Sequence, residues 1–196
     1  MADIFDAILT KGVRAGKIPG RSQDARTWFR QQARRAKTSP SQVIRASSQT
    51  LMNRQAVGQM YFFQYDPKWK KTLPYYDTFP LIFPIGPAKG GFMGINFHYL
   101  PLPLRAKLMD ALYNLTNNTK FDESTRLKIS LNILQSTARF KWYKPTVKHY
   151  LRQHLRSRFL LINSSEWDTA LFLPVARFKK GSVSDVYADS KRIINS

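Results

Sequence analysis

Cysteine is absent from the sequence, which excludes disulfide bridges and metal sites built on thiolates. Long apolar runs are also missing, because no stretch approaches the roughly 18 uninterrupted apolar residues of a membrane-spanning helix. The first segment, MADIFDAILTKG, carries acids where a secretory signal peptide needs bases. We therefore expect neither a signal peptide nor a membrane span.

Acidic residues are scarce and unevenly distributed. Only 12 Asp and Glu oppose 32 Lys and Arg, which gives a formal net charge of +20. No acid lies between Asp24 and Asp66, and nine bases but no acid lie between Ser124 and Ser165. Solubility requires net charge but not such clustering, so we expect a polyanionic partner, nucleic acid first and an anionic membrane second. A charged surface without a specific partner is the alternative.

Patterns typical of catalytic or metal sites are weak. His149 and His154 are five residues apart, whereas zinc-binding histidines on a helix are spaced by three or four. A nuclease would need neighbouring carboxylates to hold Mg²⁺, and residues 60–115 contain only three acids, Asp66, Asp77 and Asp110. We expect no enzyme activity, no cofactor and no metal ion, and nuclease activity is the enzymatic alternative to test.

Residues 60–115 are rich in aromatics and prolines and contain most of the sequence typical of β-strands. Short strands are expected at 61–65, 79–85 and 92–99. The prolines in the second strand restrict it to an edge strand or a bulged one, and a loop at 86–91 would join it to the third as a hairpin. The three strands predict a small, strongly bent antiparallel sheet, SH3-like or barrel-like in character.

Helical patterns surround this sheet and predict an α+β fold. Helices are expected at 24–37, 41–49, 102–115 and 123–138, from Pro145 to about Arg156, from Ser164 or Ser165, and from Ser182 to Arg192; a buried strand is expected at 158–162. Residues 3–9 could form a short helical segment, and Thr10 to Gln23 read as an extended basic arm. The expected organisation is a basic N-terminal arm at 1–58, a compact α+β domain at 59–180 and a C-terminal helix or tail at 181–196.

Bases recur at helical spacing on two of the predicted helices. The candidate phosphate contacts are Arg26, Arg30, Arg34 and Lys37 on the first, and Lys144, Lys148, Arg152 and Arg156 on the second. Such stripes predict binding of a polyanion with a steep salt dependence, without separating DNA from RNA, and ordinary solvated helix faces are the alternative. Aromatic side chains near bases could stack on unpaired nucleobases or pack in the core: Trp28, Trp69, Trp142 and Tyr143. Protein contacts are expected at Tyr75, Tyr76 and Phe79.

A resemblance to small basic virion proteins of T4-like myophages rests on three stretches, YFFQYDPKWKKTLPYYDTFPLIFPI, GFMGINFHYLPLPLRAKLMDALY and LRSRFLLINSSEWDTALFLPVARF. It covers roughly residues 60–180, and the pattern is similar to that of the DNA end protector proteins. The resemblance implies a late phage product, made in the bacterial host cytoplasm and carried in the virion. It would bind the ends of packaged double-stranded DNA, shield them from host exonuclease and assist head–tail joining. No catalytic residues are implied.

A second function within the virion fits the same residues. A neck, tail or baseplate subunit could use its basic faces to contact acidic surfaces of other virion proteins, including the portal. Such a subunit could form a symmetric oligomer in the particle. The two hypotheses differ in whether DNA or protein covers the basic faces.

Overall fold

The computed structural model describes residues 4–16, 27–28, 31–32, 39–46, 51–115, 123–136 and 140–196. Among them, the strands are β1 (Leu51–Met52), β2 (Met60–Phe62), β3 (Tyr76–Asp77), β4 (Leu81–Ala88), β5 (Gly91–Asn96), β6 (Val147–Leu151), β7 (Phe159–Ile162) and β8 (Phe178–Lys179). The α-helices are α1 (Ile4–Arg14), α3 (Pro40–Ala46), α4 (Leu102–Leu115), α5 (Glu123–Ser136), α6 (Trp167–Phe172) and α7 (Val183–Asn195). The short 3-10 helices are η2 (Phe97–Tyr99), η3 (Lys141–Thr146), η4 (Arg152–His154) and η5 (Ser164–Glu166).

The described part of the chain is an α+β structure, as the sequence predicts. Its larger sheet has the strand order β1-β7-β2-β4-β5-β6, and all of its pairings are antiparallel. The sheet is strongly bent, because the chain after β6 returns beside the chain after β2. There Tyr65 and Leu155 form an antiparallel bridge, and the backbone N–H of Arg156 donates to the carbonyl oxygen of Gln64 at 2.9 Å.

The predicted hairpin is formed by β4 and β5. A glycine with φ +72°, Gly90, allows the tight turn between them. The register of the pair shifts between Pro84 and Gly86, which confirms the bulged form of the strand. Of the two predicted alternatives the bulged strand is the one observed, because β4 also pairs with β2 and therefore lies inside the sheet.

The helix predicted from Pro145 is wrong. Residues 141–146 form η3, and 147–151 form β6, which pairs with β5 along its length. A spacing of four residues fits one face of a strand as well as one face of a helix, since four is a multiple of two. The hydrogen-bonded pairing with β5 and the burial of Tyr150 stabilise a strand over a helix at these residues.

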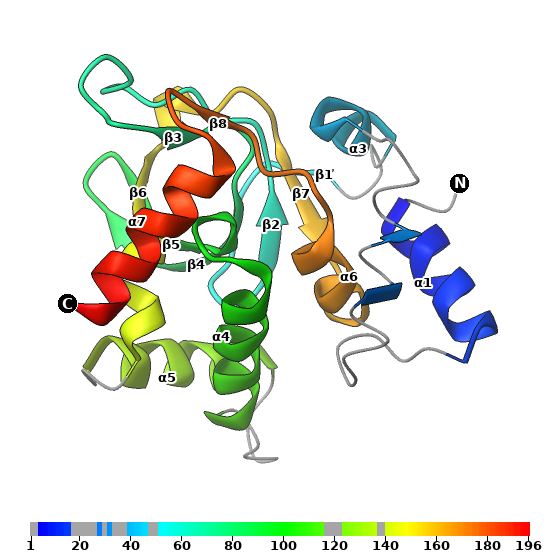
Figure 1. Cartoon of the computed structure of the whole chain (residues 1–196). Coiled ribbons are helices and arrows are strands. Elements are labelled where there is room, and N and C mark those ends of the chain that lie inside the picture. Colours follow the sequence, from blue (N-terminus) through cyan, green and yellow to red (C-terminus); the bar gives the residue numbers. More distant parts are fainter. Residues whose placement is uncertain are drawn as a thin grey trace.

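The N-terminal region is helical further than the sequence predicts. Helix α1 continues to Arg14 and residues 15–16 form a turn, so residues 10–16 are not extended; residues 17–23 of the predicted arm lie outside the described residues. Helix α3 agrees with the helix expected at 41–49. Of the helix expected at 24–37, residues 27–28 and 31–32 are helical and the others lie outside the described residues. Ile8 joins the core, and α1 lies beside α6 (Figure 1).

Two later helices begin at capping boxes. The hydroxyl of Ser182 accepts a hydrogen bond from the N–H of Asp185, and the Asp185 carboxylate accepts one from the N–H of Ser182. Asn163 and Glu166 form the same reciprocal pair at η5, just before α6. Each box satisfies backbone donors that the first turn of a helix leaves without partners. The helix starts expected near Ser164 and Ser182 are thus confirmed.

The two faces of the larger sheet bury different sets of side chains. One face, which includes Phe62 of β2 and Phe83 of β4, packs against α4, α5 and α6. Phe83 meets Trp167 of α6 edge to face. The other face buries a mainly aromatic cluster drawn from the strands and the chain after β2: Tyr61, Phe63, Tyr65, Ile82, Phe92, Tyr150 and Phe159. Neighbouring residues of β2 alternate between the two clusters, as the period of two in a strand requires.

The close approach of β5 and β6 predicts a large effect at one glycine. A Cβ on Gly91 would lie 1.8 Å from the carbonyl oxygen of Tyr150, so we expect Gly91→Ala to lower the free energy of unfolding by about 3 kcal/mol or more. At Gly94 the nearest atom is the flexible Cδ1 of Ile82 at 3.0 Å, and Gly94→Ala should cost less. Urea unfolding of both variants measures the difference. Equal losses would contradict the assigned register.

Candidate nucleic-acid interface

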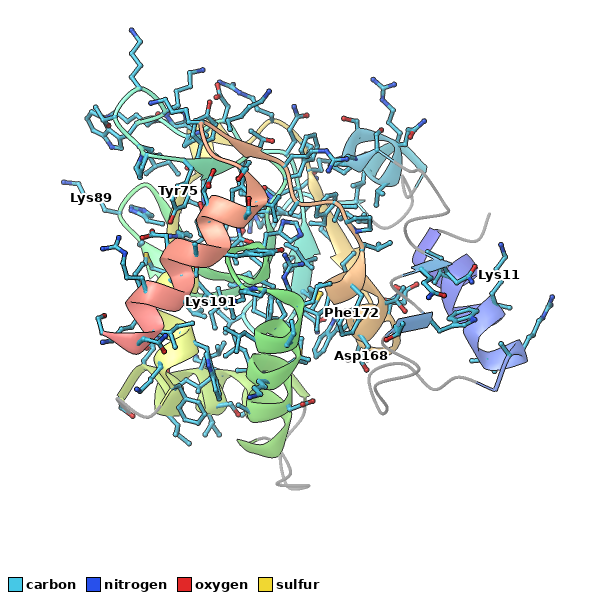
Figure 2. All side chains as sticks on the ribbon, viewed as in Figure 1. Lys11, Tyr75, Lys89, Asp168, Phe172 and Lys191 are labelled. Atoms are coloured by element: carbon cyan, nitrogen blue, oxygen red, sulfur yellow. The ribbon has the colours of Figure 1, made fainter. Side chains whose placement is uncertain are left out.

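The described residues form a cleft of about 720 Å³ beside β6. Its walls come from the chain at 65–76, the turn between β4 and β5, β6 itself and α7 (Figure 1). We call it the aromatic cleft, because its lining includes the rings of Tyr65, Trp69, Tyr75, Tyr76, Tyr99 and Tyr150. Its lining also includes Lys68, Lys89, Lys148 and His149. Figure 2 shows Tyr75 beside α7 and Lys89 projecting from the turn of the hairpin.

Most rings of the aromatic cleft are held in place by their neighbours. Tyr65 and Tyr150 meet edge to face with ring centroids 5.0 Å apart, and the hydroxyl of Tyr65 accepts a hydrogen bond from the N–H of Leu151. The rings of Tyr75 and Tyr99 lie 6.0 Å apart. Trp69 differs, because it is 62% exposed. The cleft therefore has a rigid aromatic floor and one large exposed ring at its rim.

Lys148 brings a positive charge into this aromatic surrounding. Its side chain is half-buried, and its Nζ atom lies 3.9 Å from the centroid of the Tyr99 ring. Burial lowers the pKa of Lys148 to about 8, against the opposing effect of Asp189. The ammonium group is therefore mostly charged at pH 7, and the ring face of Tyr99 stabilises it.

The acid nearest to this cation is engaged by other groups. The carboxylate of Asp189 accepts hydrogen bonds from the hydroxyl of Tyr75 and from the guanidinium of Arg192, and these bonds lower the pKa of Asp189. Asp77, which also lines the cleft, is almost fully buried beneath it. Positive charge consequently dominates the accessible part of the cleft.

The segment that carries Trp69 is fastened at two points. Lys70 Nζ lies 3.0 Å from both carboxylate oxygens of Asp66, four residues earlier. Lys180 donates from Nζ to the carbonyl oxygens of Lys71 and Leu73, at 2.6 and 3.1 Å. The segment that forms the rim is thus held at its start by Asp66 and near its end by Lys180, which directly follows β8.

A buried hydrogen-bond network supports the floor of the cleft. The carboxylate of Asp77 accepts from His98 Nδ1 at 2.8 Å, from the Asn96 amide at 3.0 Å and from the N–H of Phe79 at 3.0 Å. The Asn96 amide also donates to the hydroxyl of Tyr150 at 3.1 Å. Burial alone would raise the pKa of Asp77, but His98 and the other donors lower it, so the carboxylate is ionised. Burial lowers the pKa of His98, which is neutral and donates through Nδ1.

Arg105 supplies the buried positive charge that accompanies Asp77. It is 2% exposed and donates to the carbonyl oxygens of Leu100, His98 and Leu171 and to the hydroxyl of Tyr187. These bonds join η2, α6 and α7 to α4. The sequence does not predict this role, although Arg105 shares a helix face with the buried Leu108 and Leu112 at spacings of three and seven.

The structure separates the predicted phosphate contacts. Arg26, Arg30, Arg34 and Lys37 lie outside the described residues. Of the others, Lys148 lines the aromatic cleft, while Lys144 and Arg152 are exposed in η3 and η4. Arg156 is exposed, with its Nη2 atom 3.3 Å from Asp66. The predicted single helical face does not exist, because these four residues belong to three different elements and a loop.

The aromatic candidates fall into two groups. Tyr75, Tyr76 and Trp69 line the cleft. Phe79, expected at a protein contact, is half-buried and stacks on Phe62 with centroids 6.1 Å apart. The other candidates for base stacking pack against the core: Trp28, Trp142 and Tyr143.

The described residues contain neither a metal site nor a membrane-spanning helix. No group of three or more His, Asp or Glu in this part of the chain is placed to hold a metal ion. No helix within it is long and apolar enough to cross a membrane.

Comparison with known proteins identifies a family model that covers nearly the whole chain. The family model described as phage T4 terminal DNA protecting protein matches residues 10–195, which include every residue that lines the aromatic cleft. No curated protein and no solved structure matched the chain.

The neutral state of His98 predicts a loss of stability in acid. Because the folded-state pKa of His98 is below its usual 6.5, the unfolded chain binds more protons as the pH falls through that value. We expect the free energy of unfolding, measured by urea denaturation, to decrease from pH 7 to pH 5. In His98→Asn, whose amide can still donate to Asp77, the decrease should be smaller. An identical decrease in both proteins would contradict a neutral His98.

Proposed function

Because this chain belongs to the family of phage T4 terminal DNA protecting proteins, we propose that it binds the ends of double-stranded DNA and shields them from exonucleases. The resemblance to DNA end protector proteins seen in the sequence is confirmed by the family match. The binding of DNA ends by this chain is the step proposed here, and the charge distribution supports it.

The proposal rests on an excess of positive charge at the surface of the protein. The chain has a net charge of +20, and several of its few acids are occupied within the fold. Asp77 and Glu166 are buried, while Asp66, Asp185 and Asp189 form hydrogen bonds with neighbouring side chains. Exposed lysines and arginines are then left to meet DNA phosphates, whose neutralisation releases bound counterions.

The arrangement of the acids favours protection over cleavage. A magnesium-dependent nuclease needs neighbouring carboxylates open to the solvent. Asp77 is sealed in the interior by His98, Asn96 and Phe79, and Asp66 is paired with Lys70 and Arg156. We therefore propose a binding role without a catalytic step.

We place this role in the virion, near the head–tail junction. A protein that protects DNA ends must act where an end of the packaged genome lies, so portal and neck proteins become the expected neighbours. A neck, tail or baseplate subunit whose basic faces meet other virion proteins is the alternative, and it requires no preference for DNA ends.

The proposed function predicts protection of linear DNA. Linear double-stranded DNA incubated with the purified chain should resist a double-strand exonuclease, and gel electrophoresis measures the surviving DNA. Closed circular DNA added as a competitor should remove the protection only at a large mass excess, because it has no ends. Degradation at the rate seen without the protein, or equal competition by circular and linear DNA, would refute end protection.

The exposed bases predict a defined change in salt dependence. The double variant Lys144→Gln/Arg152→Gln should reduce the slope of log K against log salt for DNA binding by about two, since each phosphate contact contributes about one. Arg156→Gln should change the slope less, because Arg156 is already paired with Asp66. Fluorescence anisotropy over a salt series measures both. An unchanged slope in the double variant would exclude η3 and η4 from the DNA interface.

A further inference from the structure

The aromatic cleft has the size of a site for one nucleotide. Its volume of about 720 Å³ lies within the range of about 300–1,000 Å³ that is typical of small-molecule sites. A DNA duplex is far too large for this volume, since its major groove alone measures about 12 Å across. A duplex therefore cannot enter the cleft, whereas a single nucleotide released from base pairing can.

The rim of the cleft presents a free aromatic surface. Trp69 is 62% exposed, and Lys68 Nζ lies 4.9 Å from the centroid of its ring. Half-buried Tyr75 and Tyr76 continue the aromatic lining inward. Every nucleobase has a π face, so aromatic side chains beside cations bind unpaired bases with little regard to sequence. A protein that protects DNA ends of arbitrary sequence needs this type of contact.

The charges of the cleft suit a phosphate. Lys148 projects into the cleft over Tyr99, and Lys89 stands at the turn of the hairpin that borders it. The acid in reach of Lys148, Asp189, is held by Tyr75 and Arg192. An anionic group that enters the cleft therefore meets a cation in surroundings where screening by water is reduced.

We propose that the aromatic cleft receives the terminal nucleotide of a DNA strand, with the base against Trp69 and the phosphate beside Lys148. The inference rests on the proposed function and adds to it the site and the reason for end preference. A nucleotide inside a duplex is paired and stacked on both sides, so its extrusion is costly. A terminal nucleotide has a stacking neighbour on one side only, and it enters the cleft at a lower cost.

A terminal nucleotide bound in the cleft is also hidden from an exonuclease. Exonucleases act on the last phosphodiester bond, which must reach their active site. With the terminal nucleotide inside the cleft, that bond lies between the protein walls formed by the Trp69 segment and α7. The protection then depends on occupancy of this one site and not on coverage of the whole duplex.

The test compares two DNA molecules that share one stem. The first is a hairpin with one open blunt end, and the second is a dumbbell closed by loops at both ends. Fluorescence anisotropy at one fixed salt concentration measures the affinity of the full chain for each. The variants are Trp69→Ala and Lys148→Met, and Lys128→Met on α5 removes an exposed charge away from the cleft as a matched control. Thermal melts followed by circular dichroism verify that each variant is folded.

We expect Trp69→Ala to weaken binding of the open hairpin by about 5- to 150-fold, the range that one stacked base contributes. Lys148→Met should weaken it by about 10- to 150-fold, the range of one charged hydrogen bond, because it removes the cation beside the phosphate. The affinity of both variants for the dumbbell should stay within about twofold of wild type, and Lys128→Met should not alter the preference for the open hairpin. An equal loss on both molecules, or no loss on either, would overturn the assignment of the cleft. A wild-type protein that binds the dumbbell as tightly as the open hairpin would instead overturn the proposed function.

A cross-linking experiment tests the site without any variant. A 5-iodo-deoxyuridine is placed at the terminal position of the open hairpin or at the centre of its stem, and the complex is irradiated. The terminal base should cross-link to the peptide that contains Trp69, Tyr75 and Tyr76, and the central base should not. A terminal base that cross-links only elsewhere would refute the inference. The inference would also be refuted if free 5-iodo-deoxyuridine monophosphate cross-linked to these residues and the hairpin did not.

Discussion

The buried opposite charges of Asp77 and Arg105, which His98 connects, constrain much of this structure. An isolated charge in a protein interior costs several kcal/mol, so each group needs a counter-charge and a complete set of hydrogen bonds. His98 bonds to both, through its ring to the carboxylate and through its carbonyl oxygen to the guanidinium. These bonds bring together β3, η2, α4, α6 and α7, elements that are distant in the sequence. Their relative positions in turn define the walls of the aromatic cleft.

The same constraint shapes the electrostatics of the surface. A carboxylate in the core stabilises the fold but contributes little to the external field. Asp185 serves in a helix cap, and Asp66 and Asp189 form local ion pairs. The net positive charge of the chain therefore acts mainly at its surface. In the proposed mode of binding, this surface charge attracts DNA from a distance, and the mostly aromatic cleft distinguishes strand ends from continuous duplex.

Local patterns predicted the elements that depend on local interactions. Helices α4, α5 and α7, the hairpin of β4 and β5, and β7 follow from periodicity, capping residues and turn chemistry. The sequence predicts a helix in place of strand β6, because the spacing of bases around Lys148 fits both periods and the partner strand lies more than about 50 residues away. The burial of Arg105 and the aromatic cleft depend on contacts between distant segments, which no local pattern reveals. The bases beside Trp69 indicate a stacking candidate, but only the fold shows its position at the rim.

The anchoring of the Trp69 segment by Lys180 has a consequence for kinetics. A free loop of this length would lose conformational entropy on closing over a ligand, and that loss would weaken binding. Here the two hydrogen bonds from Lys180 order the segment within the fold. In the proposed mode of binding no slow loop closure is then needed, and association would be limited by the encounter and by fraying of the duplex end. The lifetime of such a complex would be set by contacts with the nucleotide and not by the opening of a lid.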